Sequence, residues 1–141
     1  LGQTDVGASM WDSFDKSWAK LHEDGIIDDD ELDGVSFPSY YRASDEFMEG
    51  IEKCEDLKII SMEEKVVRCP YRELWTAGKL EDMSPEEYAR WYVPTTRTWS
   101  HSTFKGGLRD DRSEGEKEEI MKQFWSNYMD IVAADPSSHG M

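Results

Sequence analysis

The order of three signals in residues 2–41 constrains this chain more than any other feature. The first is a set of apolar residues at three- and four-residue spacings, which is typical of one helix face: Met10, Trp11, Phe14, Trp18 and Leu21. Ser9 with Asp12 three residues later fits the start of that helix, and Gly25 fits its end. The pattern predicts an amphipathic helix with an aromatic face.

The other two signals are an acidic run and a Phe-Pro corner. Residues 28–34 (DDDELDG) are expected to form a polar connector. Residues 35–41 are expected to be extended, because the residue before Pro38 is disfavoured in helical backbone. A short helix with one apolar face is then expected over residues 44–54, and residues 57–67 alternate in a way that predicts a strand.

The second half of the chain predicts helices only. Ser84 and the proline after it form the clearest helix start. Pro94 is expected to end or kink this helix, and residues 95–104 are expected to form another short one before Gly106. Residues 113–116 open the last helix. The fold class predicted is α+β and mostly helical, with four or five helices and one or two strands.

Charge and cysteine content exclude several classes of protein. The 31 acidic and 16 basic residues give a net charge of −15, which argues against a nucleic acid or an anionic membrane as partner. No apolar run approaches the length of a membrane span, so a cytoplasmic protein is expected. Cys54 and Cys69 are too few for a disulfide framework and have no metal-ligand spacing.

The signals of residues 2–41 occur together in one known family. A tryptophan at position 11 is followed by an amphipathic helix, Glu-Asp-Gly-Ile-Ile at 23–27, an acidic run and Phe-Pro-x-Tyr at 37–40. This pattern resembles the SABATH family of S-adenosylmethionine-dependent carboxyl methyltransferases. The likeness continues through residues 56–64 and 124–136, and residues 68–108 match poorly.

The resemblance implies that the chain is the C-terminal, substrate-capping part of a Rossmann-like α/β methyltransferase with a helical cap. Residues 1–141 would be a single domain, with residues 1–67 ending the catalytic domain and residues 68–135 forming the helical cap and last helix. The family's cofactor loop lies upstream of the matching segment. S-adenosylmethionine is therefore expected to bind an N-terminal part of the same enzyme, and the 141-residue chain alone is expected to be inactive.

The resemblance also implies substrate-binding residues. Met10 and Trp11 stand where the family has the wall of its substrate pocket, and an indole offers flat apolar area with one N–H donor. Trp99 lies in the region of the helical cap over the substrate. Asp33 stands where some plant members contribute a ligand to Mg²⁺. Here Ser36 replaces the asparagine of that site and is a poorer ligand, which favours a solvated acidic turn.

No catalytic residue and no cofactor-binding residue is expected in this chain. His22, His101 and His139 share no spacing typical of a triad. The expected function is methylation of the carboxylate of a small organic acid, a reaction in which the nucleophile needs alignment more than a base. A nitrogen acceptor and a homodimer stay open. The alternative from a different class is an acidic helical protein-interaction module without catalytic activity.

Overall fold

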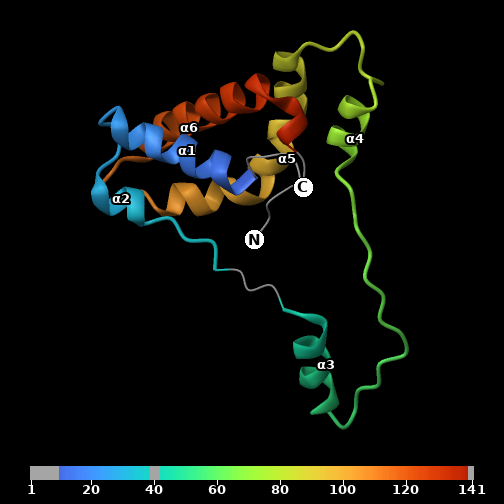
Figure 1. Cartoon of the computed structure of the whole chain (residues 1–141). Coiled ribbons are helices and arrows are strands. Elements are labelled where there is room, and N and C mark those ends of the chain that lie inside the picture. Colours follow the sequence, from blue (N-terminus) through green and yellow to red (C-terminus); the bar gives the residue numbers. More distant parts are fainter. Residues whose placement is uncertain (1–9, 39–41, 140–141) are drawn as a thin grey trace. The chain divides into compact units, whose positions relative to one another are not determined.

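The computed structural model describes residues 10–38 and 42–139, in two units. The larger unit joins Leu1–Ser36 to Arg68–Met141, and the smaller unit is Phe37–Val67. The helices of the larger unit, shown in Figure 1, are α1 (Met10–Glu23), α2 (Asp29–Asp33), α4 (Pro70–Thr76), α5 (Pro85–Gly106), α6 (Glu114–Ala134) and the 3-10 helix η1 (Pro136–Ser138). The smaller unit contains α3 (Ser44–Glu52).

Helix α1 forms where the apolar spacing predicts it. Its buried side chains are Met10, Ser13, Phe14, Ser17, Trp18 and Leu21. The helix is closed by Gly25, whose φ is +70°, and the N–H groups of Gly25 and Ile26 bond to the carbonyls of His22 and Leu21. Glycine adopts this backbone conformation at little cost, so the predicted stop is confirmed. The start expected at Ser9 lies outside the described residues.

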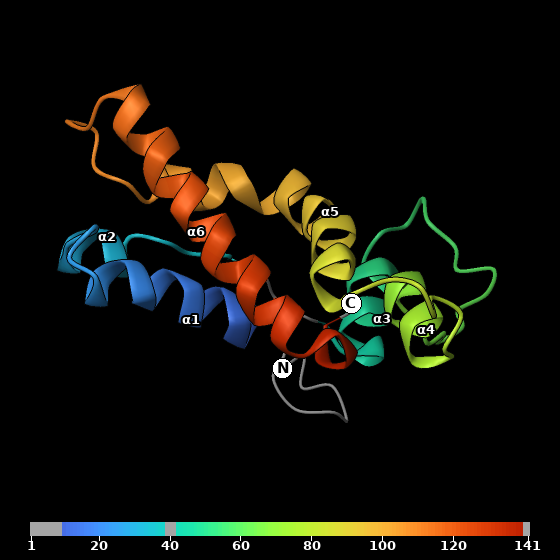
Figure 2. The same ribbon diagram turned by 90° about the horizontal axis from the view of Figure 1, so that it is seen from above.

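Helix α5 begins as predicted but does not end at its proline. The Ser84 hydroxyl accepts a hydrogen bond from the Glu87 N–H at 3.2 Å, which caps the first turn. The helix then continues through Pro94 to Gly106, so residues 95–104 are its second half and not a separate helix. Figure 2 shows α5 changing direction along its length, as a helix with an internal proline does. Buried side chains on both sides of the proline hold the helix together.

Residues 28–34 contain helix α2, so the polar connector predicted there was wrong. The Asp28 carboxylate accepts from the Glu31 N–H at 3.1 Å, and the Glu31 carboxylate accepts from the Asp28 N–H at 3.2 Å. This reciprocal pair satisfies two N–H groups that a helix start otherwise leaves unpaired. The acidic composition concealed the helix because its buried residue is Glu31, with no exposed surface, and not an apolar side chain.

Aromatic rings fill the space among the three long helices. Helix α6 packs against both α5 and α1, and Figure 2 shows it crossing in front of them. The ring centroids of Phe14 and Tyr128 are 4.7 Å apart, and those of Phe104 and Phe124 are 4.2 Å apart. Phe14 also meets Phe104 at 5.2 Å, so α1 touches α5 through side chains. Burial of each such ring contributes about 2 kcal/mol, which makes this cluster the core of the larger unit.

The smaller unit overturns the predicted strand. Helix α3 lies within the predicted range 44–54, but none of its residues is buried. Residues 57–67 form no strand, and no strand occurs elsewhere in residues 10–38 and 42–139. Alternation is not sufficient, because the N–H and C=O groups of a strand need a neighbouring strand. Instead, Ile60 and Val66 are 95% and 90% exposed. The described fold is all-helical and not α+β.

Two composition-based expectations concern thiols and membranes. Cys54 and Cys69 are both free cysteines, and Cys54 is exposed just after α3. Within the described ranges, no helix is both long enough and apolar enough to cross a bilayer.

The segment after α2 meets the turn between α5 and α6 through two glycines. A Cβ added to Gly34 would lie 2.8 Å from the Gly107 carbonyl oxygen and 3.0 Å from the Asp30 carbonyl oxygen. Both contacts are with backbone atoms, which cannot move aside as a flexible side chain does. By contrast, a Cβ added to Gly106 meets nothing within 4 Å. The close approach therefore requires glycine at position 34.

We predict that Gly34→Ala lowers the free energy of unfolding by about 1–3 kcal/mol, because the two backbone segments must separate. The matched control is Gly106→Ala in α5, which should be neutral or stabilising by about 0.5 kcal/mol. Urea unfolding followed by far-ultraviolet circular dichroism measures both changes. Equal effects of the two substitutions would contradict the close approach.

Candidate functional site

Two of the predicted substrate residues lie in contact at the edge of the aromatic core. Trp11 is in the first turn of α1 and Trp99 is in the second half of α5, and their ring centroids are 5.9 Å apart with planes inclined by 69°. Phe14 contacts both rings, at 6.1 Å from Trp11 and 6.0 Å from Trp99. Phe14 is 1% exposed whereas Trp99 is 40% exposed. We call Trp11 and Trp99 the tryptophan edge.

Met10, the third predicted substrate residue, is the first residue of α1 and is buried. Its low exposure places it in the core, and it is the residue before Trp11 of the tryptophan edge. The edge itself consists of two indoles, which are flat and mainly apolar. Such a surface suits the apolar body of a small ligand that carries a few polar groups. Whether Met10, Trp11 and Trp99 contact a substrate stays a prediction.

Asp33, the residue considered for Mg²⁺, ends α2 and is exposed. Mg²⁺ needs several oxygen ligands in octahedral geometry, and usually more than one carboxylate or phosphate supplies them. In the part of the chain that the structure describes, no group of three His, Cys, Asp or Glu side chains could hold a metal ion. Binding of Mg²⁺ by Asp33 stays a prediction, and no chemical step is assigned to a metal.

A buried ion pair fixes the end of the larger unit at which α2 lies. The Glu31 carboxylate accepts from Arg112 Nε at 2.5 Å and from Arg112 Nη2 at 2.6 Å, and also from the Arg109 N–H at 3.0 Å. Arg112 Nη2 additionally donates to the Ile26 carbonyl at 3.0 Å. The indole N–H of Trp18 donates to the Glu31 carbonyl at 3.2 Å. One residue thus joins α1, α2 and the turn between α5 and α6.

The surroundings of Glu31 favour its ionised form. Burial raises the pKa of its carboxyl, but hydrogen bonds from the Arg112 guanidinium and from the N–H groups of Arg109 and Asp28 outweigh burial and lower the pKa from 4.5 to about 2. The same pair raises the pKa of Arg112. The carboxylate is therefore charged at neutral pH and matched by a bidentate partner.

The sequence analysis did not predict this ion pair, although the sequence contains the pattern that starts the helix carrying Glu31. Asp28 with Glu31 three residues later is a helix-start pattern that predicts α2. Nothing in the sequence connects Glu31 to Arg112, because the contact depends on how α2 packs against the turn between α5 and α6. The pair positions helices and does not touch the tryptophan edge.

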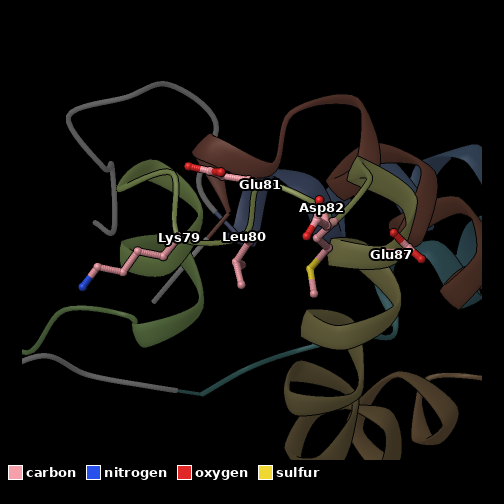
Figure 3. A pocket seen from close by; sticks show the side chains of 6 residues that line it. Lys79, Leu80, Glu81, Asp82 and Glu87 are labelled. Carbon is pink, nitrogen blue, oxygen red and sulfur yellow. The ribbon is translucent and has the colours of Figure 1, made fainter.

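A pocket of about 400 Å³ opens at the segment between α4 and α5 and the first turn of α5, and none of the predicted site residues lines it. Its lining residues are Lys79, Leu80, Glu81, Asp82, Met83 and Glu87. Figure 3 shows the Lys79 and Glu87 side chains pointing away from each other at opposite sides of the pocket. A binding site needs polar groups that converge on a ligand, so we assign no function to this pocket.

The comparison with protein families identifies the class of protein. The family of SAM dependent carboxyl methyltransferases matches residues 3–137, which is nearly the whole chain. The chain therefore belongs to the family of S-adenosylmethionine-dependent carboxyl methyltransferases, the SABATH family, as the pattern of residues 2–41 predicts.

Particular relatives match shorter parts of the chain. Gibberellic acid methyltransferase 1 of Arabidopsis thaliana is 28% identical over 79 residues, which are 55% of this chain and 20% of that protein. Gibberellic acid methyltransferase 2 of the same organism is 35% identical over 51 residues, which are 36% of this chain and 13% of that protein. The matched region thus spans 13–20% of the length of these relatives. No solved structure matches the chain.

We predict that the contribution of Glu31 to stability disappears in acid. Because the folded pKa of about 2 lies below the value of 4.5 for a free carboxyl, this contribution is complete above pH 4.5 and is lost as the pH falls toward 2. Its size is about 3 kcal/mol. Glu31→Gln should lower the free energy of unfolding at pH 7 by about that amount, with a difference from the wild type that narrows between pH 4.5 and 2.

The matched control is Glu119→Gln, because Glu119 forms an exposed pair with Lys122 at 3.5 Å. It should leave the free energy of unfolding within about 0.5 kcal/mol of the wild type at both pH values. Urea unfolding at pH 7, 4.5 and 3 gives the comparison. A constant difference between Glu31→Gln and the wild type across this range would show that the Glu31 charge does not stabilise the fold.

Proposed function

We propose that this chain forms the substrate-capping part of an S-adenosylmethionine-dependent methyltransferase that methylates the carboxylate of a small organic acid. In this proposal the tryptophan edge is the apolar wall against which the acid lies, with Met10 behind it. The family match over residues 3–137 supports the class of reaction. The observation that carries the site is the contact of Trp11 with Trp99, which brings two residues from opposite halves of the chain to one place.

The burial pattern supports the wall. Phe14 is covered by neighbouring rings, including those of Trp125 at 6.1 Å and Tyr128 at 4.7 Å, so its ring is packed against helix α6. The two indoles of the edge rest on Phe14, and Trp99 keeps 40% of its surface exposed. A large exposed aromatic side chain on a rigid base is a common form of ligand contact, because little conformational entropy is lost on binding.

In the proposed reaction this chain positions the acid and does not need to remove a proton from it. A carboxylic acid is ionised at neutral pH, so one of its oxygens is already a nucleophile. S-adenosylmethionine, when bound, supplies the methyl group. The residues of this chain would orient the acid and exclude water, which together can account for a large part of a rate enhancement. This role needs no histidine, cysteine or metal from the described residues.

S-adenosylmethionine binding is assigned to another part of the enzyme. We identify no cofactor contact among the described residues, and the matched region covers only 13–20% of the relatives' length. The proposal is therefore that an N-terminal cofactor-binding part of the same enzyme holds S-adenosylmethionine. The 141-residue chain alone would not catalyse methyl transfer.

The proposed substrate is a carboxylic acid with an apolar body. Both matched relatives are named for gibberellic acid. We propose an acid of this kind as the substrate, and gibberellic acid is the first acid to test. The tryptophan edge would contact the apolar body, since an indole side chain is mostly ring carbon.

One observation favours the rival function, an acidic protein-interaction module. Residues 57–67 expose several large apolar side chains, among them Ile60 at 95% and Val67 at 85%. The two functions differ in ligand binding. Calorimetric titration of S-adenosylhomocysteine into the natural protein that contains this chain should give heat of binding if the methyltransferase reading is right. A natural protein that binds no S-adenosylhomocysteine would favour the interaction module.

We predict that Trp11→Ala and Trp99→Ala in the natural protein each raise the Michaelis constant for the acid about tenfold, because each removes an aromatic contact worth about 1–1.5 kcal/mol. The affinity for S-adenosylmethionine should stay unchanged. Initial-rate kinetics with each substrate varied in turn separates the two effects.

The matched control is Trp91→Ala. Trp91 is on the same helix and is also 40% exposed, but its ring contacts Tyr71 at 4.4 Å and is not part of the tryptophan edge. It should change neither constant by more than about twofold. An equal rise in the Michaelis constant for Trp91→Ala, or a matching loss of cofactor affinity in the edge variants, would refute the wall.

A further inference from the structure

His139 is the buried residue at which three helices of the larger unit meet. Its Nε2 lies 2.8 Å from the Ser13 hydroxyl of α1, and its Nδ1 lies 2.8 Å from the Asp135 carbonyl at the end of α6. The Tyr88 hydroxyl of α5 donates to the His139 carbonyl at 3.0 Å. Only 1% of His139 and none of Ser13 is exposed. The proposed mechanism uses neither residue.

The two ring contacts define one protonation state. A carbonyl oxygen only accepts hydrogen bonds, so Nδ1 carries the proton toward Asp135. Nε2 of the neutral ring is then an acceptor, and the Ser13 hydroxyl donates to it. Because a buried cation is costly, burial lowers the pKa of His139, an effect that the Asp135 carbonyl and carboxylate oppose and the Lys16 charge reinforces.

Other groups around the ring complete its electrostatic setting. The Tyr128 ring of α6 lies 6.2 Å from the imidazole, edge to face. Helix α4 packs against η1 and contributes Arg72, whose charge acts on the Tyr88 hydroxyl. The Asp135 carboxylate also accepts from the Ser138 hydroxyl, which holds the segment that carries His139 in place.

Ser13 connects this cluster to the tryptophan edge. It lies in the first turn of α1 together with Met10 and Trp11. The Ser17 hydroxyl donates to the Ser13 carbonyl at 2.7 Å, so the cluster continues into the next turn. A first helical turn lacks half of the hydrogen bonds of a helix interior and frays readily. A side-chain contact at Ser13 therefore determines how firmly Trp11 is held.

We propose that His139 is a positioning residue for the substrate wall: through its hydrogen bond with Ser13 it holds the first turn of α1, and with it Trp11, against Trp99. This inference rests on the proposed function, and it adds a residue that does not touch the substrate. Because burial lowers the pKa of His139, the neutral ring persists below pH 6.5, the usual value for a free histidine. At lower pH the ring gains a charge, and since a buried cation is costly, its packing and the first turn of α1 loosen. The acid would then bind more weakly while cofactor binding persists.

The test uses the natural protein that contains this chain, labelled with 5-fluorotryptophan. The ¹⁹F resonance of Trp11 is assigned by its loss in Trp11→Phe. In the wild type this resonance should stay in place between pH 7.5 and 6.5 and move as the pH falls below 6.5, because the pKa of His139 is lowered. His139→Gln keeps an amide that can accept from Ser13 but does not titrate, so the movement should disappear. In Ser13→Ala, which removes the donor and leaves His139 in place, the resonance should already be displaced at pH 7.5.

Kinetics gives the second readout. His139→Leu should raise the Michaelis constant for the acid about tenfold at pH 7.5 with little change in the turnover number, and His139→Gln should restore much of the loss. The matched control is His22→Gln, because His22 is partly exposed and pairs with Asp29 at 2.7 Å on the outer surface. It should leave both the Trp11 resonance and the Michaelis constant as in the wild type.

Two results would overturn the inference. One is a pH-dependent movement of the Trp11 resonance that persists unchanged in His139→Gln and Ser13→Ala. The other is the expected ¹⁹F behaviour without any change in the Michaelis constant, which would make His139 a structural residue only. If instead Trp11→Ala itself leaves the Michaelis constant unchanged, the proposed wall fails while the coupling of His139 to Trp11 still stands.

Discussion

The buried carboxylate of Glu31 is the interaction on which the arrangement of the larger unit depends. This carboxylate accepts hydrogen bonds from the guanidinium of Arg112, and the backbone carbonyl of Glu31 accepts one from the indole N–H of Trp18. Removing one partner of such a pair leaves an uncompensated charge in the interior, which costs far more than an apolar replacement of both. The position of α2, and the turn from α5 to α6, are therefore tied to α1 at a single residue.

A second tie lies near the opposite end of α1. There the imidazole of His139 bonds to Ser13, while Glu31 contacts Trp18 in the second half of the helix. Between the two ties, aromatic rings of α1, α5 and α6 pack in edge-on and tilted contacts that leave Phe14 almost without exposed surface. The tryptophan edge is the outer boundary of that packing. It is supported by the Phe14 ring beneath it and, in the inference above, by the tie at Ser13, and a wall for an apolar ligand requires such support.

Local signals were predictable and long-range contacts were not. Helix α1, the start of α5 and the start of α6 follow from spacing and capping residues that lie within a few positions of each other. The prediction of a strand at residues 57–67 was wrong, because alternation of apolar and polar residues does not supply the neighbouring strand that the backbone needs. The polar connector predicted around Glu31 was wrong because this charged residue occupies a buried position. Trp11 and Trp99 came from a family resemblance, and their contact depends on how α1 and α5 both pack on α6.

We infer that the tryptophan edge faces the substrate. The most direct measurement is a ¹⁹F titration of the natural protein, labelled with 5-fluorotryptophan and saturated with S-adenosylhomocysteine, with gibberellic acid as the added acid. If the edge faces the substrate, the resonances of Trp11 and Trp99 should shift together while that of Trp91 stays in place. Binding of the acid that shifts Trp91, or that leaves both Trp11 and Trp99 unmoved, would contradict it.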